Sequence, residues 1–339
     1  MEFKQTLGIQ HPIIQAPMAG VTTPEFVAAC AETGVLGSLG AGYLSAEDTR
    51  TAIQQVKLLT KRPFSVNLFV PDNTPFDQKE LRLAYLALQP IGEQLGMPFW
   101  KAPLSEPDLQ SQINVVLEEK PAVCSFTFGI PDAESVEKLH ESGIVLIGTA
   151  TTVDEAMAVE QAGLDMVVIQ GSEAGGHRGS FHPDGPLISM DGLLAEVREL
   201  IRIPIIAAGG IATNARMTEL LKSGASAIQI GTALLATEES GAADAYKQAI
   251  LNADSDNTVI TNVFSGRPAR GIHNRFIEQM NQSPIAPYPY QNDLTKRIRK
   301  EAAVQNNAEF LSLWAGTAVH LVQAGTVHSV VAQLLSKEQ

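Results

Sequence analysis

The sequence predicts a protein of the α/β class, with eight parallel strands, each followed by a helix, and a second, mainly helical domain. Eight short apolar runs alternate with amphipathic stretches, and each pair spans about 25 to 35 residues, the size of a βα repeat. The alternation breaks twice, after the third run and after the eighth. No G-x-G-x-x-G motif follows the first run, which counts against a doubly wound dinucleotide-binding sheet. Eight buried parallel strands therefore predict a TIM (β/α)8 barrel.

The first unit shows the signals on which each element rests. Residues 11–18 form an apolar run that stops at Pro17, and Thr22 or Thr23 can cap a helix that begins at Pro24. By the same signals the predicted strands are 11–18, 35–39, 64–70, 122–128, 144–147, 165–169, 204–208 and 225–230. The predicted barrel helices are 24–33, 46–59, 133–142, 152–162, 190–201 and 213–223.

Two segments do not follow this rhythm. Residues 71–120 contain prolines at positions 71, 75, 90, 98, 103 and 107 and two helical stretches, and they are too long for an ordinary βα loop. From Thr237 the chain changes to amphipathic helices with proline-rich joints, ending in 310–335. We therefore predict that residues 1–70 and 121–236 form the barrel and that residues 71–120 and 237–339 form a helical cap domain.

Composition limits the possible partners. The formal net charge of -13 repels phosphate backbones and anionic lipids, so neither nucleic acid nor a membrane is expected as a partner. No apolar run approaches the roughly 20 residues of a membrane helix, and no secretory signal pattern begins the chain. Cys30 and Cys124 form no C-x-x-C pair and predict buried thiols in a reducing compartment. We expect a cytoplasmic protein, either a monomer or a homodimer.

A glycine-rich loop with one histidine follows the sixth predicted strand. Loops that leave the ends of barrel strands carry active sites, and the glycines of residues 170–181 let the backbone approach a flat ligand closely. His177 is the only side chain of this loop whose ordinary pKa lies near neutrality, so it can move a proton or hold a charge. A mobile loop with an incidental histidine is the alternative.

The loops after the seventh and eighth strands carry the signals of a phosphate site. In a barrel these loops are neighbours, and their backbone N–H groups commonly bind phosphate. Glycines remove the Cβ atoms that would block the anion, and the Thr232 hydroxyl adds a donor. The predicted site consists of Gly209, Gly210, Gln229, Ile230, Gly231 and Thr232. A tight strand-to-helix turn at Gly209 and Gly210 is the alternative.

A phosphate at this end and a glycine-lined wall fit a flat phosphorylated cofactor such as FMN. Asn67 and Gln170 carry amides that both donate and accept, so they could pair with the polar edge of the flavin ring. Asn67 could instead be a satisfied polar residue at a strand end. Neither H-x-x-x-H nor a cysteine cluster is present, so we expect no metal.

A basic segment and a pair of tyrosines are further candidates. The basic segment contains Arg267, Arg270, His273 and Arg275. It could attract an anionic substrate or close over the cofactor, and pairing with surface carboxylates is the alternative. Tyr288 and Tyr290 lie in a proline-rich joint, where they could reach into a cleft or cap an apolar domain contact.

Seven features of the chain together carry a family resemblance. They are residues 12–19 (PIIQAPMA), Asn67, 125–129 (SFTFG), 170–179 (QGSEAGGHRG), 207–211 (AAGGI), 229–232 (QIGT) and 266–270 (GRPAR). The combination resembles the nitronate monooxygenases, formerly called 2-nitropropane dioxygenases, over nearly the whole chain. The closest match is to the bacterial and fungal class whose loop reads Glu-Ala-Gly-Gly-His-Arg.

The resemblance implies a TIM barrel with a helical second domain that binds FMN non-covalently. Such an enzyme would oxidise anionic alkyl nitronates, such as propionate 3-nitronate, with O2 to a carbonyl compound and nitrite, a detoxifying reaction. The implied FMN contacts are Asn67, Gln170, Gly175, Gly210, 229–232 and Met18, which would lie against the ring. His177 would be catalytic, either by stabilising the nitronate or by removing the α-proton of a nitroalkane. Tyr288 and Tyr290 would match the family's active-site tyrosines.

Two other functions fit the same residues. The flavin-dependent enoyl reductases of fatty-acid synthesis carry a similar Gly-Gly-His loop, so the chain could be an NAD(P)H-dependent flavin reductase acting on an enoyl thioester or a quinone. A non-catalytic barrel that binds a phosphorylated metabolite is the more distant alternative, because a fold alone does not determine function.

Overall fold

Eight parallel strands close into a barrel, which confirms the predicted fold class. The computed structural model describes residues 2–71 and 77–336. The sheet order is β1-β9-β8-β6-β5-β4-β3-β2. The first and last strands meet where the Gln15 N–H donates to the Leu36 carbonyl at 2.9 Å and the Leu36 N–H to the Ile13 carbonyl at 3.0 Å. The strands are β1 (Ile13–Gln15), β2 (Gly37–Gly40), β3 (Phe64–Phe69), β4 (Val123–Thr127), β5 (Val145–Ala150), β6 (Met166–Gln170), β8 (Ile205–Ala208) and β9 (Ala227–Ile230).

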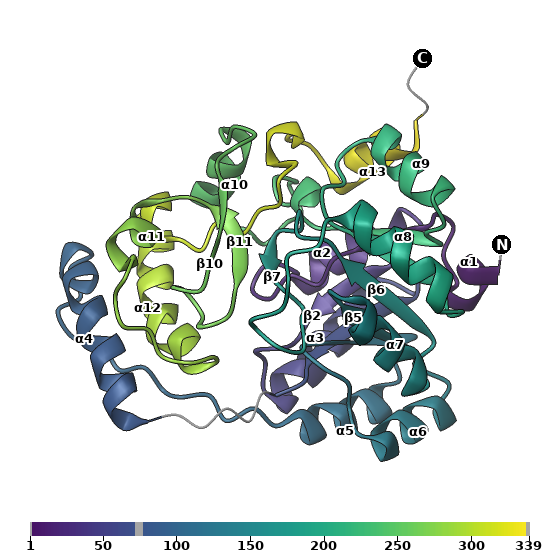
Figure 1. Ribbon diagram of the computed structural model, residues 1–339, viewed down its shortest axis with the longest axis horizontal. Helices are drawn as coiled ribbons and strands as arrows, with labels where there is room; N and C mark the ends of the chain where they lie inside the picture. The colour runs from purple at the N-terminus through teal and green to yellow at the C-terminus, as the bar shows by residue number, and fades with distance from the viewer. Residues whose placement is uncertain (1, 72–76, 337–339) are drawn as a thin grey trace.

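The outer ring contains the six predicted barrel helices and also α5, which the sequence placed in the insertion. These helices are α2 (Pro24–Glu32), α3 (Ala46–Leu59), α5 (Leu109–Glu119), α6 (Ala133–Glu141), α7 (Val153–Gln161), α8 (Met190–Leu200) and α9 (Asn214–Lys222). The Thr23 hydroxyl caps α2 by accepting from the Phe26 N–H. The eighth position is filled by α13 (Val327–Leu335), which packs against α2 and α9 (Figure 1). The barrel is thus completed by the last helix of the chain.

A short N-terminal helix covers the end of the barrel at which the strands begin. Helix α1 (Glu2–Leu7) buries Phe3 and Leu7 against inward-facing strand residues such as Ile14 and Val168. A second apolar cluster fills the space between strands and outer helices, because buried parallel strands are covered by helices on their outer face. The open end, where the strands terminate, is left for the site.

The second part of the molecule lies beside the barrel, at the left in Figure 1. It contains α4 (Gln78–Gln94), α10 (Asp244–Leu251), β10 (Thr258–Thr261), β11 (Ala269–Ile272), α11 (Arg275–Met280) and α12 (Tyr290–Val304), with 3-10 turns at Ala308–Phe310 and Val319–Leu321, whereas the 3-10 turn at Thr232–Leu234 follows β9 in the barrel. Its apolar cluster joins Leu88 and Trp100 to Phe264 and Phe276, and α4 packs on α12. Segments from both breaks in the rhythm therefore share one core.

The packing of helices α5 and α13 indicates where the boundary between the barrel and the cap lies. Ile113 and Val116 of α5, and Val327 and Val331 of α13, belong to the barrel cluster. The boundaries expected from the sequence placed both helices in the cap. We propose that α5 and α13 belong to the barrel, since their apolar faces are buried against it.

A three-stranded sheet joins the cap to the histidine loop. Its order is β10-β11-β7, where β7 (Gly176–His177) is part of the loop that follows β6. Both pairings are antiparallel, and Ala269 of β11 lies opposite His177. Of the basic segment, Arg270 lies in β11 opposite Gly176, whereas Arg275 is the first residue of α11.

Candidate active site

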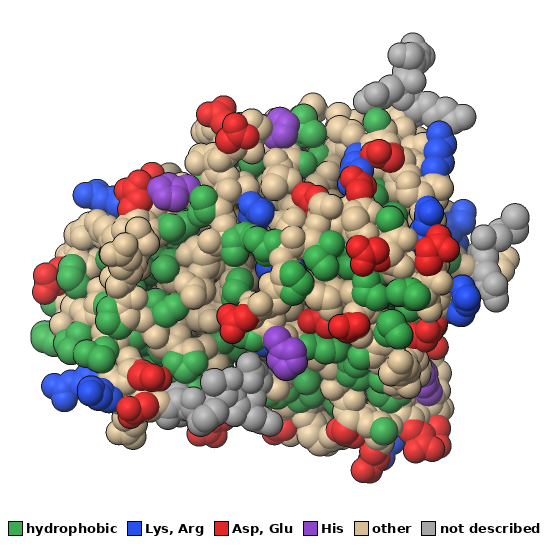
Figure 2. Space-filling view, viewed as in Figure 1, with side chains coloured by type: hydrophobic (Ala, Val, Ile, Leu, Met, Phe, Trp, Pro, Cys, Tyr) green, Lys and Arg blue, Asp and Glu red, His purple; other side chains and the backbone are tan. Residues whose placement is uncertain are grey.

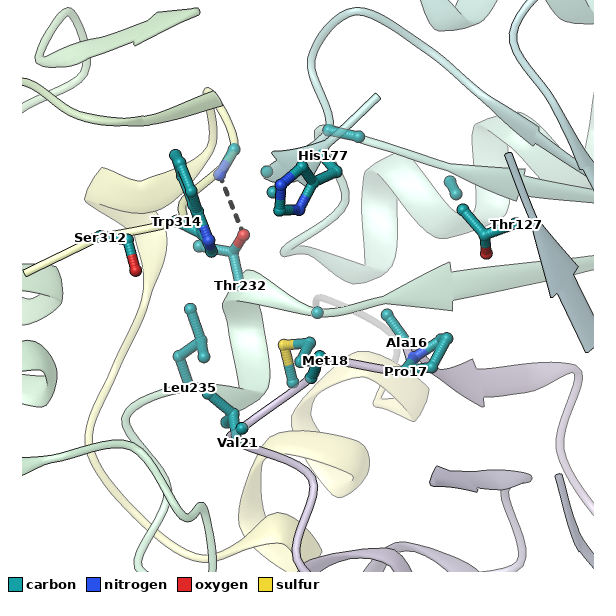
Figure 3. A pocket seen from close by; sticks show the side chains of 18 of the residues that line it. Ala16, Pro17, Met18, Val21, Thr127, His177, Thr232, Leu235, Ser312 and Trp314 are labelled. Carbon is teal, nitrogen blue, oxygen red and sulfur yellow. Dashed lines mark hydrogen bonds between the residues drawn. The ribbon is translucent and has the colours of Figure 1, made fainter. Parts of the chain in front are cut away.

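A cavity of about 580 Å³ lies at the ends of the barrel strands, between barrel and cap. Its size falls within the range of pockets that hold cofactors and small ligands. The structure brings into its wall the predicted residues Met18, Asn67, Gln170, Gly175, His177, Gly209, Gly210, Gln229, Ile230, Gly231 and Thr232. Figure 3 shows that Met18, His177 and Thr232 approach it from three different segments.

The glycines of the predicted phosphate loops form an open cradle. Gly210 has a φ of +67°, a left-handed conformation that glycine adopts without strain. A Cβ added to Gly231 would lie 3.3 Å from the Ala16 Cβ and 3.4 Å from the Met18 sulfur, so it would fill space beside them. The Thr232 hydroxyl accepts the Gly316 N–H at 3.0 Å and keeps its own proton for another acceptor. The cradle and its donors fit a phosphate group.

Asn67 has the polarity that the edge of a flavin ring requires. Its amide nitrogen donates to the Ser125 hydroxyl at 3.0 Å and to the Thr127 hydroxyl at 3.1 Å. Its amide oxygen accepts no hydrogen bond from the described residues, although Asn67 is buried and lines the cavity. An amide oxygen at the cavity wall can accept a hydrogen bond from a ligand, and the ring N–H of FMN would supply one.

Gln170 binds the histidine loop rather than leaving its amide free. The side-chain nitrogen donates to the His177 carbonyl at 3.0 Å, and the side-chain oxygen accepts from the Gly179 N–H at 2.8 Å. Gln170 therefore closes the loop upon its own strand. The contribution of Gln170 to the site is to fix the position of His177. The sequence predicted Gln170 as a cofactor contact and did not indicate this role.

His177 is half-buried among three aromatic rings and one hydroxyl. Its Nε2 lies 2.8 Å from the Ser265 Oγ, and its ring centroid lies 5.4 Å from that of Trp314, 6.0 Å from Phe128 and 6.4 Å from Tyr288. Burial, followed by the charges of Arg299 and Arg267, lowers the pKa of His177 to about 3. The imidazole is therefore neutral at physiological pH.

Two arginines of the basic segment point inward and hold the loop. The Arg267 guanidinium donates to the carbonyls of Ser180 at 2.9 Å and Phe181 at 3.2 Å, and it stacks 4.3 Å from the Phe128 ring centroid. Arg270 donates to the Ser172 carbonyl at 2.9 Å. The two side chains therefore hold the histidine loop at its beginning, near Ser172, and at its end, near Phe181. Of the other two members, His273 and Arg275 are exposed.

The two candidate tyrosines lie outside the cavity wall. Tyr288 is buried, and its ring lies 5.5 Å from that of Phe128, so it backs the wall beside His177. Tyr290 begins α12 and packs against the apolar cluster of the cap. Neither hydroxyl is among the polar groups that line the cavity. Burial raises the pKa of Tyr288 well above its ordinary value, so the phenol stays protonated.

Several lining residues were not expected from the sequence. Tyr43, Lys296, Arg299 and Trp314 all face the cavity. Arg299 donates to the Asn292 side-chain oxygen at 2.7 Å, which holds it in place. The one available signal was the cluster of basic residues in α12, at Lys296, Arg297, Arg299 and Lys300, and it does not tell which of them face the cavity. These charges make the cavity attractive to an anion.

The face of the molecule that Figure 2 shows carries charges of both signs. On the face shown in Figure 2, Lys and Arg side chains are interspersed with Asp and Glu over both parts of the molecule. Within residues 2–71 and 77–336, the helices are too short or too polar to cross a membrane. The same residues contain no group of three or more His, Cys, Asp and Glu side chains placed to hold a metal ion.

Comparison with known proteins connects this site to one family. The family model for nitronate monooxygenase matches residues 2–337. A probable nitronate monooxygenase of Staphylococcus haemolyticus is 43% identical over 343 residues, covering 99% of this chain and 96% of the relative. A probable nitronate monooxygenase of Staphylococcus saprophyticus is 42% identical over 338 residues, covering 98% and 95%.

Two solved structures are similar over the same length. The crystal structure of nitroalkane oxidase from Streptomyces ansochromogenes has a TM-score of 0.92 at 37% identity, covering 98% of this chain and 97% of the other. FabK from Thermotoga maritima has a TM-score of 0.77 at 28% identity, covering 98% and 94%. The resemblance inferred from the motifs is confirmed, and because the family model spans nearly every residue, the chain belongs to the nitronate monooxygenase family.

Proposed function

We propose that the protein is an FMN-dependent enzyme that oxidises alkyl nitronates, such as propionate 3-nitronate, with O2 to a carbonyl compound and nitrite. The observation that carries this proposal is the neutral His177 beside a glycine cradle, in a cavity that also presents Arg299 and Lys296. The two cationic side chains favour an anionic substrate. Membership in the nitronate monooxygenase family supports the same chemistry.

FMN would be held by the residues that fit it. The cradle at Gly209, Gly210 and Gly231, with Thr232, would receive the phosphate, and the Asn67 amide oxygen would accept from the ring. Met18 would lie against the ring face. When bound, FMN supplies the electron-accepting group, while the protein provides orientation and electrostatics.

The chain's own contribution is to bind and orient the nitronate. A neutral imidazole can donate one hydrogen bond to a nitronate oxygen. A group with a pKa near 3 is a weak base, so deprotonation of a neutral nitroalkane by His177 is disfavoured. We therefore propose that the nitronate anion, rather than the nitroalkane, is the substrate. Cytoplasmic location is consistent with two free, buried cysteines and remains part of the proposal.

In the test, the purified holoprotein is mixed separately with propionate 3-nitronate, with a neutral nitroalkane and with NADH, and the three reactions are compared. Oxygen uptake with release of nitrite is expected from the nitronate, with much slower turnover of the nitroalkane. Rapid anaerobic bleaching of the flavin by NADH, with no response to nitronate, would favour the reductase alternative. A purified protein without any flavin absorbance would overturn both.

A further inference from the structure

We propose that Trp314 determines the size of substrate that the site accepts, by limiting the length of the carbon chain that can lie beside His177. This inference rests on the proposed function, because it concerns the nitronate bound at that site. It is carried by the position of the indole, which stands between Ser312 and His177 in Figure 3. The ring centroids of Trp314 and His177 are 5.4 Å apart in an edge-to-face arrangement.

The indole is wedged from several sides, so it acts as a fixed wall. A Cβ on Gly271 would lie 2.9 Å from the Trp314 Cε3, which shows how closely the ring packs on β11. The ring of Phe264 meets it edge-on at 5.4 Å. The Tyr246 hydroxyl donates to the Trp314 carbonyl at 2.5 Å, which fixes the backbone as well. A side chain locked in this way excludes volume without a conformational change.

Part of the cavity wall is apolar, since Leu235, Ala242, Tyr246 and Leu311 line the cavity and also belong to the apolar cluster of the cap. The hydroxyl of Tyr246 binds the Trp314 carbonyl, and Leu311 and Ser312 come just before Trp314 in the chain, so this apolar region lies next to Trp314. Leu235 lines the cavity below Ser312 and Trp314 in Figure 3. Aliphatic and aromatic walls of this kind fit a hydrocarbon chain. With Trp314 in place, a nitronate held by His177 meets the indole before its chain can enter this region.

The other rings around His177 leave the indole as the residue that decides chain length. Phe128 also lines the cavity, but the Arg267 guanidinium stacks on its ring and holds it in place, and Tyr288 lies outside the cavity wall. Trp314 is half-exposed to the cavity and reaches both His177 and the apolar region. Replacement of Trp314 by a smaller side chain should therefore connect the space beside His177 with the apolar region.

The experiment measures kcat/KM of the FMN-loaded enzyme for straight-chain nitronates from ethyl to hexyl. The wild type should favour the short chains, and Trp314→Ala should raise the hexyl-to-ethyl ratio by roughly 10-fold or more, since each methylene in an apolar pocket is worth a factor of this order. Trp314→Phe should lie between them. Trp100→Phe is the matched control, because Trp100 is the only other tryptophan of the chain and lies in the cap core.

A second measurement does not depend on turnover. Straight-chain carboxylates of the same lengths are titrated into the oxidised holoprotein, and dissociation constants are read from the shift of flavin absorbance. Tighter binding of long chains by Trp314→Ala than by the wild type, by a similar factor, supports the inference even if no nitronate is oxidised. An unchanged length preference in both series, in variants that still bind FMN, overturns it. Should Trp314→Ala lose FMN, Trp314→Leu and Trp314→Phe decide the question.

Discussion

At the scale of the residue, the electrostatics of His177 are unusual for a histidine in an active site. The ring sits beside two arginines, with Ser265 as its hydrogen-bond partner, and burial and both arginine charges disfavour the protonated form. In the proposed function, a histidine so placed would bind an anion as a neutral donor. The charge that attracts the substrate would come from other side chains, Arg299 and Lys296, which line the cavity.

This environment predicts a pH dependence of stability. The pKa of His177 is about 3 in the folded state and near its ordinary value of 6.5 in the unfolded state, so only the unfolded chain binds this proton between those values. Stability should therefore be unaffected above pH 6.5 and fall as the pH drops below it, by up to about 1.4 kcal/mol per pH unit from this group. Urea unfolding of wild type and His177→Gln between pH 5 and 7.5 measures the difference. Equal slopes for the two proteins would contradict the prediction.

Arg267 offers a second prediction at this scale. Arg267→Met removes the donors to the Ser180 and Phe181 carbonyls, so the limb of the loop that carries His177 should shift. Because displacement of a catalytic group by about 1 Å can cost 10²-fold, we expect kcat to fall by on the order of 100-fold while FMN remains bound.

The control for Arg267 is a change in the same basic segment. Arg275→Met removes an exposed charge that makes no side-chain contact with the loop in the described structure, and should leave kcat near the wild-type value. Loss of FMN or of folded protein in Arg267→Met, by flavin absorbance and circular dichroism, would show a wider structural role. Turnover equal to that of Arg275→Met would refute the positioning role.

At the scale of the element, the proposed phosphate-binding role of the loop after β9 can be tested by adding one methyl group, in Gly231→Ala. A Cβ at Gly231 would meet its nearest neighbours at 3.3 and 3.4 Å, so Gly231→Ala should fold but fill part of the cradle. We expect weaker FMN binding, by roughly 10-fold or more, at nearly unchanged apoprotein stability. Gly185→Ala, whose Cβ would have 3.5 Å of clearance, is the control. Fluorescence titration with FMN gives both constants, and equal affinities would place the phosphate elsewhere.

The elements differ in how far the sequence predicts them. All eight barrel strands were predicted near their observed positions, because each is a short apolar run with a defined end. The strands β7, β10 and β11 of the second sheet were missed, since runs of two to four residues carry no clear periodicity and their pairing is set by tertiary contacts.

The candidate site shows the same division. Glycines and His177 were recognised because their types are informative in a strand-end loop. Arg299 and Trp314 were missed because they lie far away in sequence, on α12 and in the coil after it, and only the packing of the cap brings them to the barrel. Gln170 was found at the site, but its bonds to the loop depend on a backbone path that sequence does not specify.

At the scale of the whole molecule, the barrel depends on a helix that comes after the cap. Val331→Asp places a carboxylate against the barrel core, where the native side chain is 2% exposed. We expect destabilisation by about 3 kcal/mol or more, because a buried, unpaired charge is costly. Gln333→Asp on the exposed face of α13 is the matched control and should change stability little. Thermal unfolding followed by circular dichroism distinguishes the two, and similar midpoints would mean that α13 is dispensable for the barrel.

The pairing of β7 with β11 means that the histidine loop is not a transferable unit. The loop belongs to the barrel part of the chain, but the groups that hold it come from the cap: strand β11, the Ser265 hydroxyl and the Arg267 guanidinium. A graft of residues 170–181 into another barrel would therefore need residues 265–272 as well. Conversely, substitutions in the cap can alter the setting of His177 while the proposed cofactor cradle in the barrel stays unchanged, so related enzymes can diverge in reactivity through the cap.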